Sequence, residues 1–335
     1  MTGGIVNSRI LVTGGAGFIG SNLVDVLLDL GCEIVVLDNF STGKKENLRS
    51  AEGNPRFRLI VGDIRNIEDC RKAVDGVDYV LHQAALGSVP RSIADPLTSW
   101  EVNTGGFAKM AIAARDAGVK RFIYASSSSV YGDDASPVKI EERTGSPLSP
   151  YAASKQAQEL FARNIGRVYG FKSIGLRYFN VFGRRQDPYG AYAAVIPKFA
   201  TALLRHKSPV INGDGTYSRD FTYIDNVVQA NLLALGTDDP AALDQVYNIA
   251  YGERTTLNEL FSYLRGELSK FDPEIARIEA KYGPARAGDI PHSLAGIEKA
   301  KKLLGYIPRF GIREGLSEAA EWYYRHLGQA EGVDA

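Results

Sequence analysis

A tyrosine and a lysine four residues apart, in Tyr151-Ala-Ala-Ser-Lys155, have the residue types and the spacing for proton transfer. On a helix, residues at i and i+4 share a face, so the phenol and the ammonium would lie together. A free phenol ionises near pH ~10, but a neighbouring cation favours the phenolate and lowers this pKa. We therefore predict that Tyr151 exchanges a proton and that Lys155 lowers its pKa. Taken alone, this spacing also fits an exposed pair on a helix surface.

A run of serines, Ser126 to Ser129, directly follows the apolar segment 121–125, which reads as a strand. Open parallel sheets bind ligands at the carboxyl ends of their strands. A serine at that position can hydrogen-bond a reacting oxygen while Tyr151 exchanges the proton. The run could instead be a polar loop, but its place between a glycine-rich turn and the Tyr/Lys helix favours an active site.

The glycine-rich turn is Gly14-Gly-Ala-Gly17-Phe-Ile-Gly20, between a predicted strand and a predicted helix. Such a turn brings backbone and a helix N-terminus close to a diphosphate. Asp38 ends the next strand, where a carboxylate can bind ribose hydroxyls and would repel a 2′-phosphate, so NAD is favoured over NADP. Asp63 is placed for the adenine, although it could instead cap the helix that starts near residue 67. The residues expected to contact NAD are Gly14, Gly17, Phe18, Ile19, Gly20, Asp38, Asn39, Ser41, Thr42, Gly43, Asp63, Ile64, Gln83, Ala84, Ala85, Asn103, Ser126, Tyr151, Lys155 and Tyr178.

The first half of the chain alternates short apolar runs with segments of helical periodicity. The runs 9–13, 33–38, 57–61, 78–82, 121–125 and 173–179 read as strands, and 18–30, 67–74, 104–117 and 150–169 as helices. Near-continuous apolar strands are typical of a parallel sheet covered on both faces. We predict an α/β fold: a doubly wound, Rossmann-type parallel sheet over 8–183 and a smaller C-terminal substrate-binding α/β lobe over 184–330. Part of 221–250 is expected to return to the first domain.

Composition excludes several classes of partner and cofactor. The 335 residues are 44% hydrophobic and 23% charged, with 39 Lys+Arg and 39 Asp+Glu. This balance argues against binding to nucleic acid or to a membrane surface. Residues 1–8 carry no basic or apolar run, and no stretch reaches the ~20 apolar residues of a membrane span, so a cytoplasmic location is expected. Cys32 and Cys70 are expected to be buried thiols, and the four histidines lack metal-ligand spacing, so no metal is predicted.

Further motifs lie at 37–43, 82–92, 126–132, 150–155, 176–185, 190–197, 213–220 and 286–289. With the glycine turn, they resemble the extended short-chain dehydrogenase/reductase family, and more narrowly bacterial UDP-N-acetylglucosamine 4-epimerases, from about Arg9 to Tyr324. The resemblance implies one tightly held NAD, a UDP-sugar substrate and a homodimer formed through the helices 104–117 and 150–169. It also implies that Ser127, Tyr151 and Lys155 are catalytic. The residues it implies for the UDP-sugar are Gly87, Ser88, Ser127, Ser128, Ser129, Tyr151, Asn180, Ala194, Val195, Val210, Asn212, Arg219, Arg286, Asp289 and Ser293.

The mechanism implied by the resemblance is inversion at C4 with no net redox change. Tyr151 takes the proton of the C4 hydroxyl as hydride passes to the nicotinamide, and the 4-keto sugar turns and receives the hydride on its other face. Arg219 and Arg286 would grip the diphosphate during this turn, although either could be a solvated surface charge.

The identity of the sugar depends on departures from the galactose-type pattern. Gly87-Ser88 stands where those enzymes often have a lysine, and Ser293 where they can have a bulky tyrosine. The small Ser293 leaves room for an N-acetyl group, so UDP-GlcNAc and UDP-GalNAc are the expected substrates, with UDP-Glc and UDP-Gal also possible. A UDP-hexuronic acid is an alternative, because Arg91 or Lys198 could meet a carboxylate.

Three other functions fit the sequence less well. A 4,6-dehydratase would need an Asp-Glu pair where Ser128 and Ser129 stand, and a reductase consuming NADPH conflicts with Asp38. A non-catalytic NAD-sensing protein has no need of Ser127, Tyr151 and Lys155 together.

Overall fold

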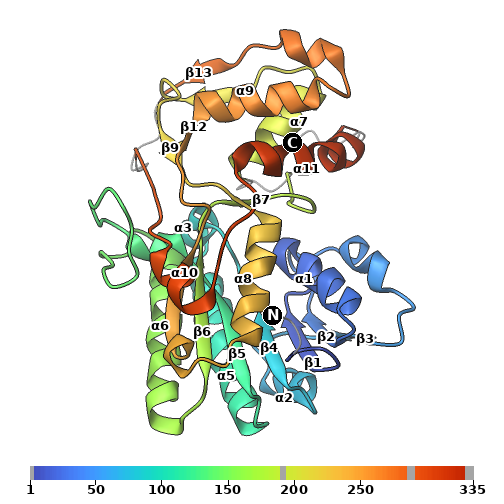
Figure 1. Ribbon diagram of the computed structural model, residues 1–335, viewed down its shortest axis with the longest axis vertical. Helices are drawn as coiled ribbons and strands as arrows, with labels where there is room; N and C mark the ends of the chain where they lie inside the picture. The colour runs from blue at the N-terminus through green and yellow to red at the C-terminus, as the bar shows by residue number, and fades with distance from the viewer. Residues whose placement is uncertain (1–3, 189–193, 285–290, 329–335) are drawn as a thin grey trace. The chain divides into compact units, whose positions relative to one another are not determined.

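The computed structural model describes residues 4–188, 194–284 and 291–328, and the chain divides into two compact units (Figure 1). Unit 1 comprises the residues up to Phe179 together with Val227–Ile249 and Gly296–Ile307. Unit 2 comprises Asn180–Asn226, Ala250–Ala295 and the residues from Pro308 onward. Within the described ranges, no helix is both long and apolar enough to cross a lipid bilayer.

A seven-stranded sheet in the order β11-β6-β5-β4-β1-β2-β3 forms the centre of unit 1, and each neighbouring pair is parallel. The strand order reverses between β1 and β4, which is where doubly wound sheets open a crevice for a ligand. The predicted doubly wound α/β fold is therefore confirmed. The strands are β1 (Arg9–Thr13), β2 (Glu33–Asp38), β3 (Phe57–Val61), β4 (Tyr79–His82), β5 (Arg121–Ser127), β6 (Ser173–Tyr178) and β11 (Gln245–Ile249).

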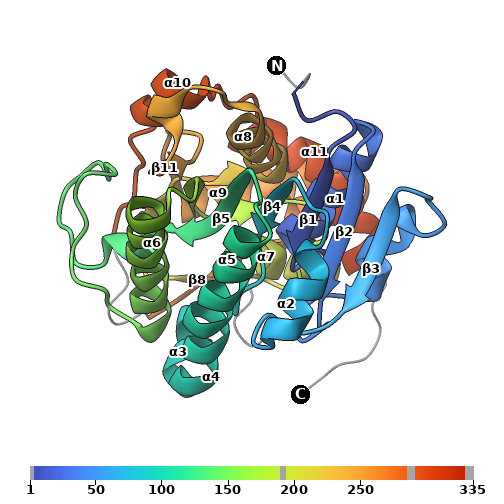
Figure 2. The same cartoon turned by 90° about the horizontal axis from the view of Figure 1, so that it is seen from below.

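Helices cover both faces of this sheet, with α2, α5 and α6 on one face and α1 and α8 on the other (Figure 2). The burial of aromatic rings fixes the first of these layers: Phe107 on α5 meets Phe122 and Tyr124 of β5 edge-to-face, with centroids 5.7 and 5.2 Å apart. The helices are α1 (Phe18–Asp29), α2 (Ile67–Val74), α3 (Val89–Ala94), α4 (Pro96–Trp100), α5 (Phe107–Asp116), α6 (Pro150–Tyr169), α8 (Ile224–Gly236) and α10 (Glu298–Leu304).

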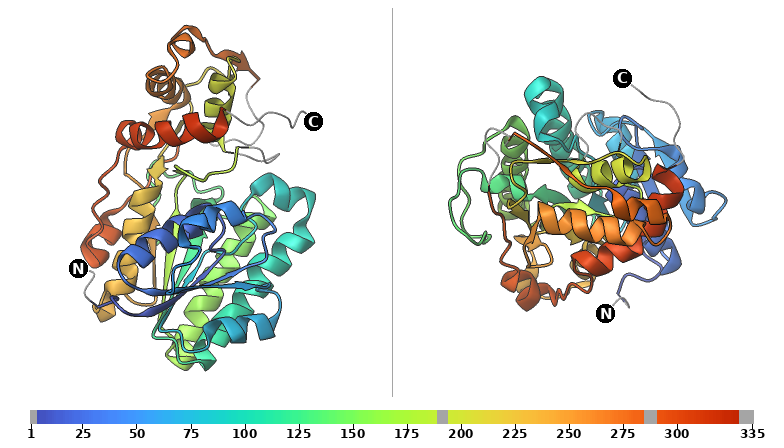
Figure 3. Two further views of the ribbon diagram at one scale, coloured as in Figure 1. Left: turned by 90° about the vertical axis from the view of Figure 1, so that its right-hand side faces the viewer. Right: turned by 90° about the horizontal axis from the view of Figure 1, so that it is seen from above.

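Unit 2 is built from three helices that pack on one another and from short strand pairs (Figure 3). β7 pairs with β10 and β8 with β13 in parallel, whereas β9 pairs with β12 antiparallel. The elements are β7 (Val181–Phe182), α7 (Val195–Leu204), β8 (Val210–Asn212), β9 (Ser218–Arg219), β10 (Thr222–Tyr223), β12 (Thr255–Thr256), α9 (Leu257–Leu268), β13 (Lys281–Gly283) and α11 (Ile312–Leu327).

One helix differs from its predicted form. The pattern at 104–117 predicts one continuous helix, but the structure has a π-helical turn over Glu101–Gly106 that joins α4 to α5. Such turns occur often at functional sites. Cys32 and Cys70 are buried free thiols, as predicted.

Candidate active site

The glycine turn after β1 forms a cradle with no room for side chains. Gly14 has φ +67°, and a Cβ there would lie 2.8 Å from the backbone of Ala84. A Cβ at Gly20 would lie 2.2 Å from the Gly14 carbonyl oxygen. The N-cap of α1 is Gly17, so no side-chain cap occupies the first amide groups of the helix. A helix start of this kind offers N–H groups and partial positive charge to an anion.

A cavity of about 290 Å³ lies beside this turn. At its rim Asp38 accepts hydrogen bonds from the amides of Ala16 (2.9 Å) and Phe40 (2.8 Å), and burial raises the pKa of its carboxyl. The predicted cofactor residues that line the cavity are Gly14, Gly17, Phe18, Ile19, Gly20, Asp38, Asn39, Ser41, Thr42, Gly43, Asp63, Ile64, Gln83, Ala84 and Ala85. Gly87, predicted for the sugar, also lines it.

Asp63 does not cap α2. The N-cap is Asn66, whose side chain accepts from the Glu68 amide. Asp63 instead binds Arg65 and Asn39, and the hydrogen bond from Arg65 is the main cause that lowers its pKa to about 2. The carboxylate therefore stays ionised at the cavity wall.

The ends of β5 and α6 bring a serine and a tyrosine together. Ser127 ends β5 and accepts a hydrogen bond from the Ser129 amide at 3.2 Å. α6 starts with a capped turn, because the Ser149 hydroxyl accepts from the Ala152 amide and Pro150 occupies the first helical position, and this fixes Tyr151. The Ser127 side chain is near enough to the Tyr151 phenol to act on the pKa of the phenol.

Burial raises the pKa of Tyr151, and the Ser127 side chain lowers it by a smaller amount. The net direction is upward, so these groups of the chain do not by themselves produce the low pKa that we predict from the sequence. A cationic ring bound nearby would act in the required direction.

Lys155 is buried below the Tyr151 ring, with its Nζ 5.9 Å from the ring centroid. The ammonium donates to the Ala125 carbonyl oxygen at 2.8 Å and to Oε1 of Gln158 at 3.2 Å. Burial lowers the pKa of Lys155 to about 7, against the opposing charge of Glu159. Because this value is near neutrality, small changes around Lys155 would change its charge.

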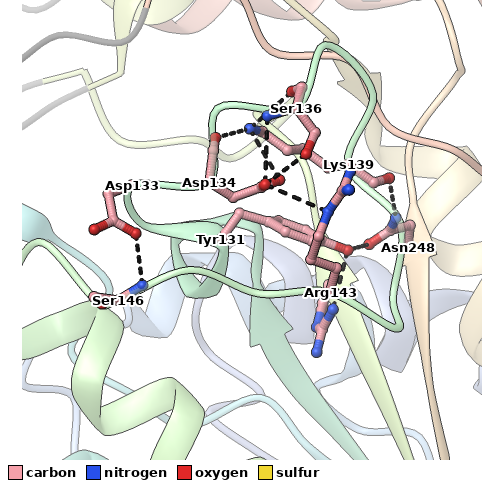
Figure 4. Close-up of polar contacts among 9 residues, drawn as sticks. Tyr131, Asp133, Asp134, Ser136, Lys139, Arg143, Ser146 and Asn248 are labelled. Atoms are coloured by element: carbon pink, nitrogen blue, oxygen red, sulfur yellow. Dashed lines mark hydrogen bonds and ion pairs between the residues drawn. The ribbon is translucent and has the colours of Figure 1, made fainter.

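The loop between the serine turn and α6 is held by side chains (Figure 4). The buried Lys139 ammonium donates to the carbonyl oxygens of Asp134 and Ser136 and to the Asp134 carboxylate. The Tyr131 hydroxyl donates to Asn248 at 2.6 Å, and Asn248 donates to the Lys139 carbonyl oxygen. The segment that joins Ser127 to Tyr151 is therefore held by Lys139 from within and by Asn248 of β11 from outside.

Unit 2 contains a separate cavity of about 550 Å³. Arg219 of β9 lines it, and its guanidinium donates to the carbonyl oxygens of Ser218 (2.9 Å) and Pro291 (3.3 Å). The Ser293 amide donates to the Ser218 carbonyl oxygen at 3.2 Å, so the segment with Ser293 runs beside β9. The predicted sugar-nucleotide residues that line the cavity are Asn180, Val195, Val210, Asn212 and Arg219.

Other predicted residues take different places. The predicted cofactor residues that do not line the first cavity are Asn103, Ser126, Tyr151, Lys155 and Tyr178. Asn103 binds the Leu86 backbone, Ser126 binds Glu159, and Tyr178 binds Gln83. Ser88 caps α3, and the buried Ser129 hydroxyl has no hydrogen-bond partner among the described residues. Ser128 starts the turn after β5, and Ala194 is the N-cap of α7. Arg286 and Asp289 lie outside the described residues.

Several residues of the two cavities were not predicted. Tyr217 and Phe221 line the unit 2 cavity together with Arg219. Their spacing at i, i+2 and i+4 places all three on one face of an extended segment, and this signal could have identified them. Asn231 contacts the predicted residue Tyr178 from a distant part of the chain, where spacing carries no signal. Gln158 contacts Lys155 from three residues along α6, and this helical spacing could have identified it. Among the residues that the structure describes, no three His, Cys, Asp or Glu side chains gather where they could hold a metal ion.

A model of the NAD dependent epimerase/dehydratase family matches residues 10–250. The chain belongs to this family. UDP-glucose 4-epimerase of Mycolicibacterium smegmatis is 37% identical over 317 residues, covering 94% of this chain and 98% of the relative. UDP-N-acetylglucosamine 4-epimerase of Methanobrevibacter ruminantium, solved with UDP-N-acetylmuramic acid, aligns with TM-score 0.88 and 39% identity over 95% of this chain and 98% of that one. UDP-glucose 4-epimerase of Thermotoga maritima, solved with UDP-glucose, gives TM-score 0.86 and 37% identity over 95% and 99%.

NAD is the cofactor of this family, and the described residues of unit 1 fit it. The cradle at Gly14 and Gly20 admits only backbone, and the amide groups at the start of α1 are not covered by a side-chain cap. Asp38 places a carboxylate at the end of β2, where an adenosine ribose would be bound. The first two features suit the diphosphate of a dinucleotide, and the third suits its adenosine ribose.

Proposed function

We propose that this protein is a UDP-sugar 4-epimerase that interconverts UDP-GlcNAc and UDP-GalNAc and also accepts UDP-Glc and UDP-Gal. The observation that carries the proposal is the convergence of three side chains: Ser127 is near enough to the Tyr151 phenol to lower its pKa, and Lys155 Nζ lies over the phenol ring, 5.9 Å from its centroid. The relatives described above, which are UDP-sugar 4-epimerases by name, support the same activity.

Each catalytic side chain has a distinct role in this proposal. The chemistry that a bound nicotinamide supplies is the reversible acceptance of a hydride from C4 of the sugar. Tyr151 exchanges the proton of the C4 hydroxyl, and Ser127 hydrogen-bonds the same oxygen. Lys155 holds positive charge below the phenol and so favours the phenolate. Ser128 and Ser129 are proposed beside the sugar, and the buried Ser129 hydroxyl has no hydrogen-bond partner among the described residues.

A sugar that is reduced on the opposite face must turn while its nucleotide stays bound. We assign the binding of the UDP part to unit 2, where Arg219, Asn180 and Asn212 line one cavity. A guanidinium suits a diphosphate because its N–H groups match two phosphate oxygens. Arg286 and Asp289 are proposed for the same nucleotide, as the sequence predicts.

The preference for an N-acetyl group is assigned to Ser293. Its backbone is bound to Ser218, next to Arg219. A tyrosine at this position would fill the space beside C2, so we expect Ser293→Tyr to reduce turnover of UDP-GlcNAc by at least about tenfold and to spare UDP-Glc. Ser293→Ala, which keeps a small side chain, is the matched control. Equal loss for both sugars would show that Ser293 does not select the substrate.

We also propose that the protein is a homodimer. Of the two helices that the sequence implies for the subunit contact, α6 carries exposed apolar side chains, whereas the described residues of α5 expose no large apolar side chain. α3 and α4 pack beside α6, and the exposed residues of the three helices include Ile93 (64%), Leu97 (76%) and Leu160 (66%). An exposed apolar surface on neighbouring helices is typical of a subunit contact. Leu97→Glu combined with Leu160→Glu should halve the mass measured by light scattering, whereas Ile307→Glu, at another exposed apolar residue (68%), should leave it unchanged.

The activity itself is tested with the purified protein and no added nucleotide. UDP-GlcNAc, UDP-Glc and UDP-glucuronic acid are supplied separately, and the C4 epimers are separated by chromatography. We expect epimer formation without steady accumulation of NADH, and a loss of about 10²-fold or more in Tyr151→Phe. If NAD is bound but none of the sugars is inverted at C4, the proposal is wrong.

A further inference from the structure

Gln158 lies three residues after Lys155 on α6, and it is 1% exposed. Its Oε1 accepts the hydrogen bond from Lys155 Nζ at 3.2 Å. Its Nε2 donates to the backbone carbonyl oxygen of Asn103, in the π-helical turn. The buried amide therefore links the lysine of the candidate site to a different segment of unit 1.

The two partners fix the orientation of this amide. An ammonium can only donate, so it requires an oxygen, and a carbonyl can only accept, so it requires an N–H group. A side chain that carries both at its end satisfies the two partners at once. A carboxylate would place an oxygen against the Asn103 carbonyl, and an apolar side chain would leave both partners without their hydrogen bond.

Hydrogen bonds of Asn103 connect Gln158 further to the wall of the cofactor cavity. The Asn103 amide accepts from the Leu86 N–H at 2.8 Å and donates to the Leu86 carbonyl oxygen at 3.2 Å, and Leu86 lines the cavity. The same amide donates to the Ser154 hydroxyl on α6 at 3.2 Å. Gln158 thus stands between the lysine and the wall of the dinucleotide cavity.

The charge state of Lys155 is sensitive to the loss of a hydrogen-bond acceptor. Lys155 has two acceptors, the Ala125 carbonyl and Gln158, and burial already brings its pKa to about 7. The titratable and charged groups around it are Tyr151 and Glu159 on its own helix and His82 at the end of β4. Burial keeps His82 neutral, because its pKa is about 3. Loss of the Gln158 oxygen would therefore favour the neutral amine.

We propose that Gln158 is a positioning residue of the epimerase: its amide holds the Lys155 ammonium below Tyr151 and connects it to the segment that borders the cofactor. This inference rests on the proposed function, because it assigns Gln158 a part in setting the charge state of the proton-exchanging tyrosine. Gln158 itself is not expected to touch the sugar.

The test compares Gln158→Met with Gln156→Met in the NAD-loaded protein. Methionine is close to glutamine in size but removes both hydrogen bonds. Gln156 is a matched control, because it also donates from α6 to backbone carbonyls, those of Val130 (2.9 Å) and Gly145 (3.0 Å), without contacting Lys155. If Gln158→Met is not folded, Gln158→Asn replaces it, because a shorter amide cannot span both partners.

Two readouts are measured. The first is the ultraviolet absorbance of tyrosinate against pH, with Tyr151→Phe as the blank, which reports the ionisation of Tyr151 without turnover. The second is the pH profile of kcat and KM with UDP-GlcNAc. We expect Gln158→Met to move the Tyr151 midpoint and the acidic limb of kcat up by about one pH unit, to lower kcat at pH 7 about tenfold and to change KM little.

An unchanged midpoint in folded Gln158→Met overturns the proposal even if kcat falls, because a packing defect would lower activity without moving the titration. A shift of equal size in Gln156→Met also overturns it. The failure of the proposed function is distinct: the wild-type protein would titrate Tyr151 but invert none of the UDP-sugars.

Discussion

Glu159 and Arg177 form a buried ion pair with two parallel hydrogen bonds, Nε to Oε1 at 2.9 Å and Nη2 to Oε2 at 2.7 Å. Their side chains are only 6% and 3% exposed. Ser126, next to the candidate catalytic serine, donates to the same carboxylate, and Tyr131 accepts from the same guanidinium. The pair therefore joins α6 and β6 to Ser126 of β5, the residue before Ser127.

Arg177→Met should lower the free energy of unfolding by about 3–5 kcal/mol, because the Glu159 carboxylate would remain buried without its partner. Urea denaturation followed by circular dichroism measures this change. Arg71→Met is the control: its ion pair with Glu68 is exposed, and it should cost less than about 1 kcal/mol. Equal effects of the two changes would contradict a structural role of the buried pair.

Asp38→Ser should weaken the retention of NAD by at least about tenfold and allow NADP to bind, because it removes the charge that we propose for binding the adenosine ribose. The measurement is the NAD content after gel filtration, followed by calorimetric titration with each nucleotide. Asp29→Asn, at an exposed position at the end of α1, should leave both unchanged. Undiminished discrimination against NADP in Asp38→Ser would show that another group selects the cofactor.

Asp220 gives unit 2 a pH-dependent stability. Its buried carboxylate accepts from the amides of Tyr251, Gly252 and Ala295, but burial outweighs these bonds and raises the pKa from 3.8 to about 7. A group whose pKa is raised in the folded state stabilises the protein fully when the pH is below its pKa in the unfolded chain. This contribution is lost as the pH rises through its pKa in the folded state. The Tm of the wild type relative to Asp220→Asn should therefore fall between about pH 4 and about pH 7. A difference that stays constant over this range would mean that Asp220 is ionised throughout.

Lys139→Met should loosen the loop between Ser127 and Tyr151. The change removes an ammonium from three oxygens that hold this loop and leaves the Asp134 carboxylate without this buried partner. We expect faster proteolysis between residues 132 and 149 and a loss of stability of about 3 kcal/mol or more. Lys299→Met, which affects an ion pair with the exposed Glu142, is the control. Unchanged cleavage rates would show that other contacts hold the loop.

Six of the seven strands of the sheet could be predicted closely, because each is a short apolar run bounded by turn residues. β11 was not predicted as a strand, because the polar Gln245 and Asn248 interrupt its apolar run. β1, β2, β3, α2 and α6 have the predicted bounds, and β5 is longer by two residues. The π-helical turn before α5 could not be predicted, since 3.6-residue periodicity does not distinguish it from an ordinary helical turn. Asp95 caps α4 and Pro96 opens it, which is a start signal that we did not use.

The candidate site was predictable where residues act through local geometry and unpredictable where they act through distant contacts. The glycine turn and the Tyr151–Lys155 spacing follow from a few neighbouring residues. The contacts of Gln158 with Asn103 and of Tyr178 with Asn231 join segments more than fifty residues apart, and depend on tertiary packing. The upward pKa of Tyr151 also depends on burial, which is a property of the folded chain.

The chain passes between the two units after Phe179, Asn226, Ile249, Ala295 and Ile307. No single cut of the gene could therefore release either unit whole, and a C-terminal truncation after Phe179, Asn226, Ile249 or Ala295 would remove strands or helices from both. To replace one unit by the corresponding unit of another protein, the chain would have to be joined at several points at once. We expect the two units to be inherited and altered together, with changes in specificity arising by substitution within them rather than by recombination between them.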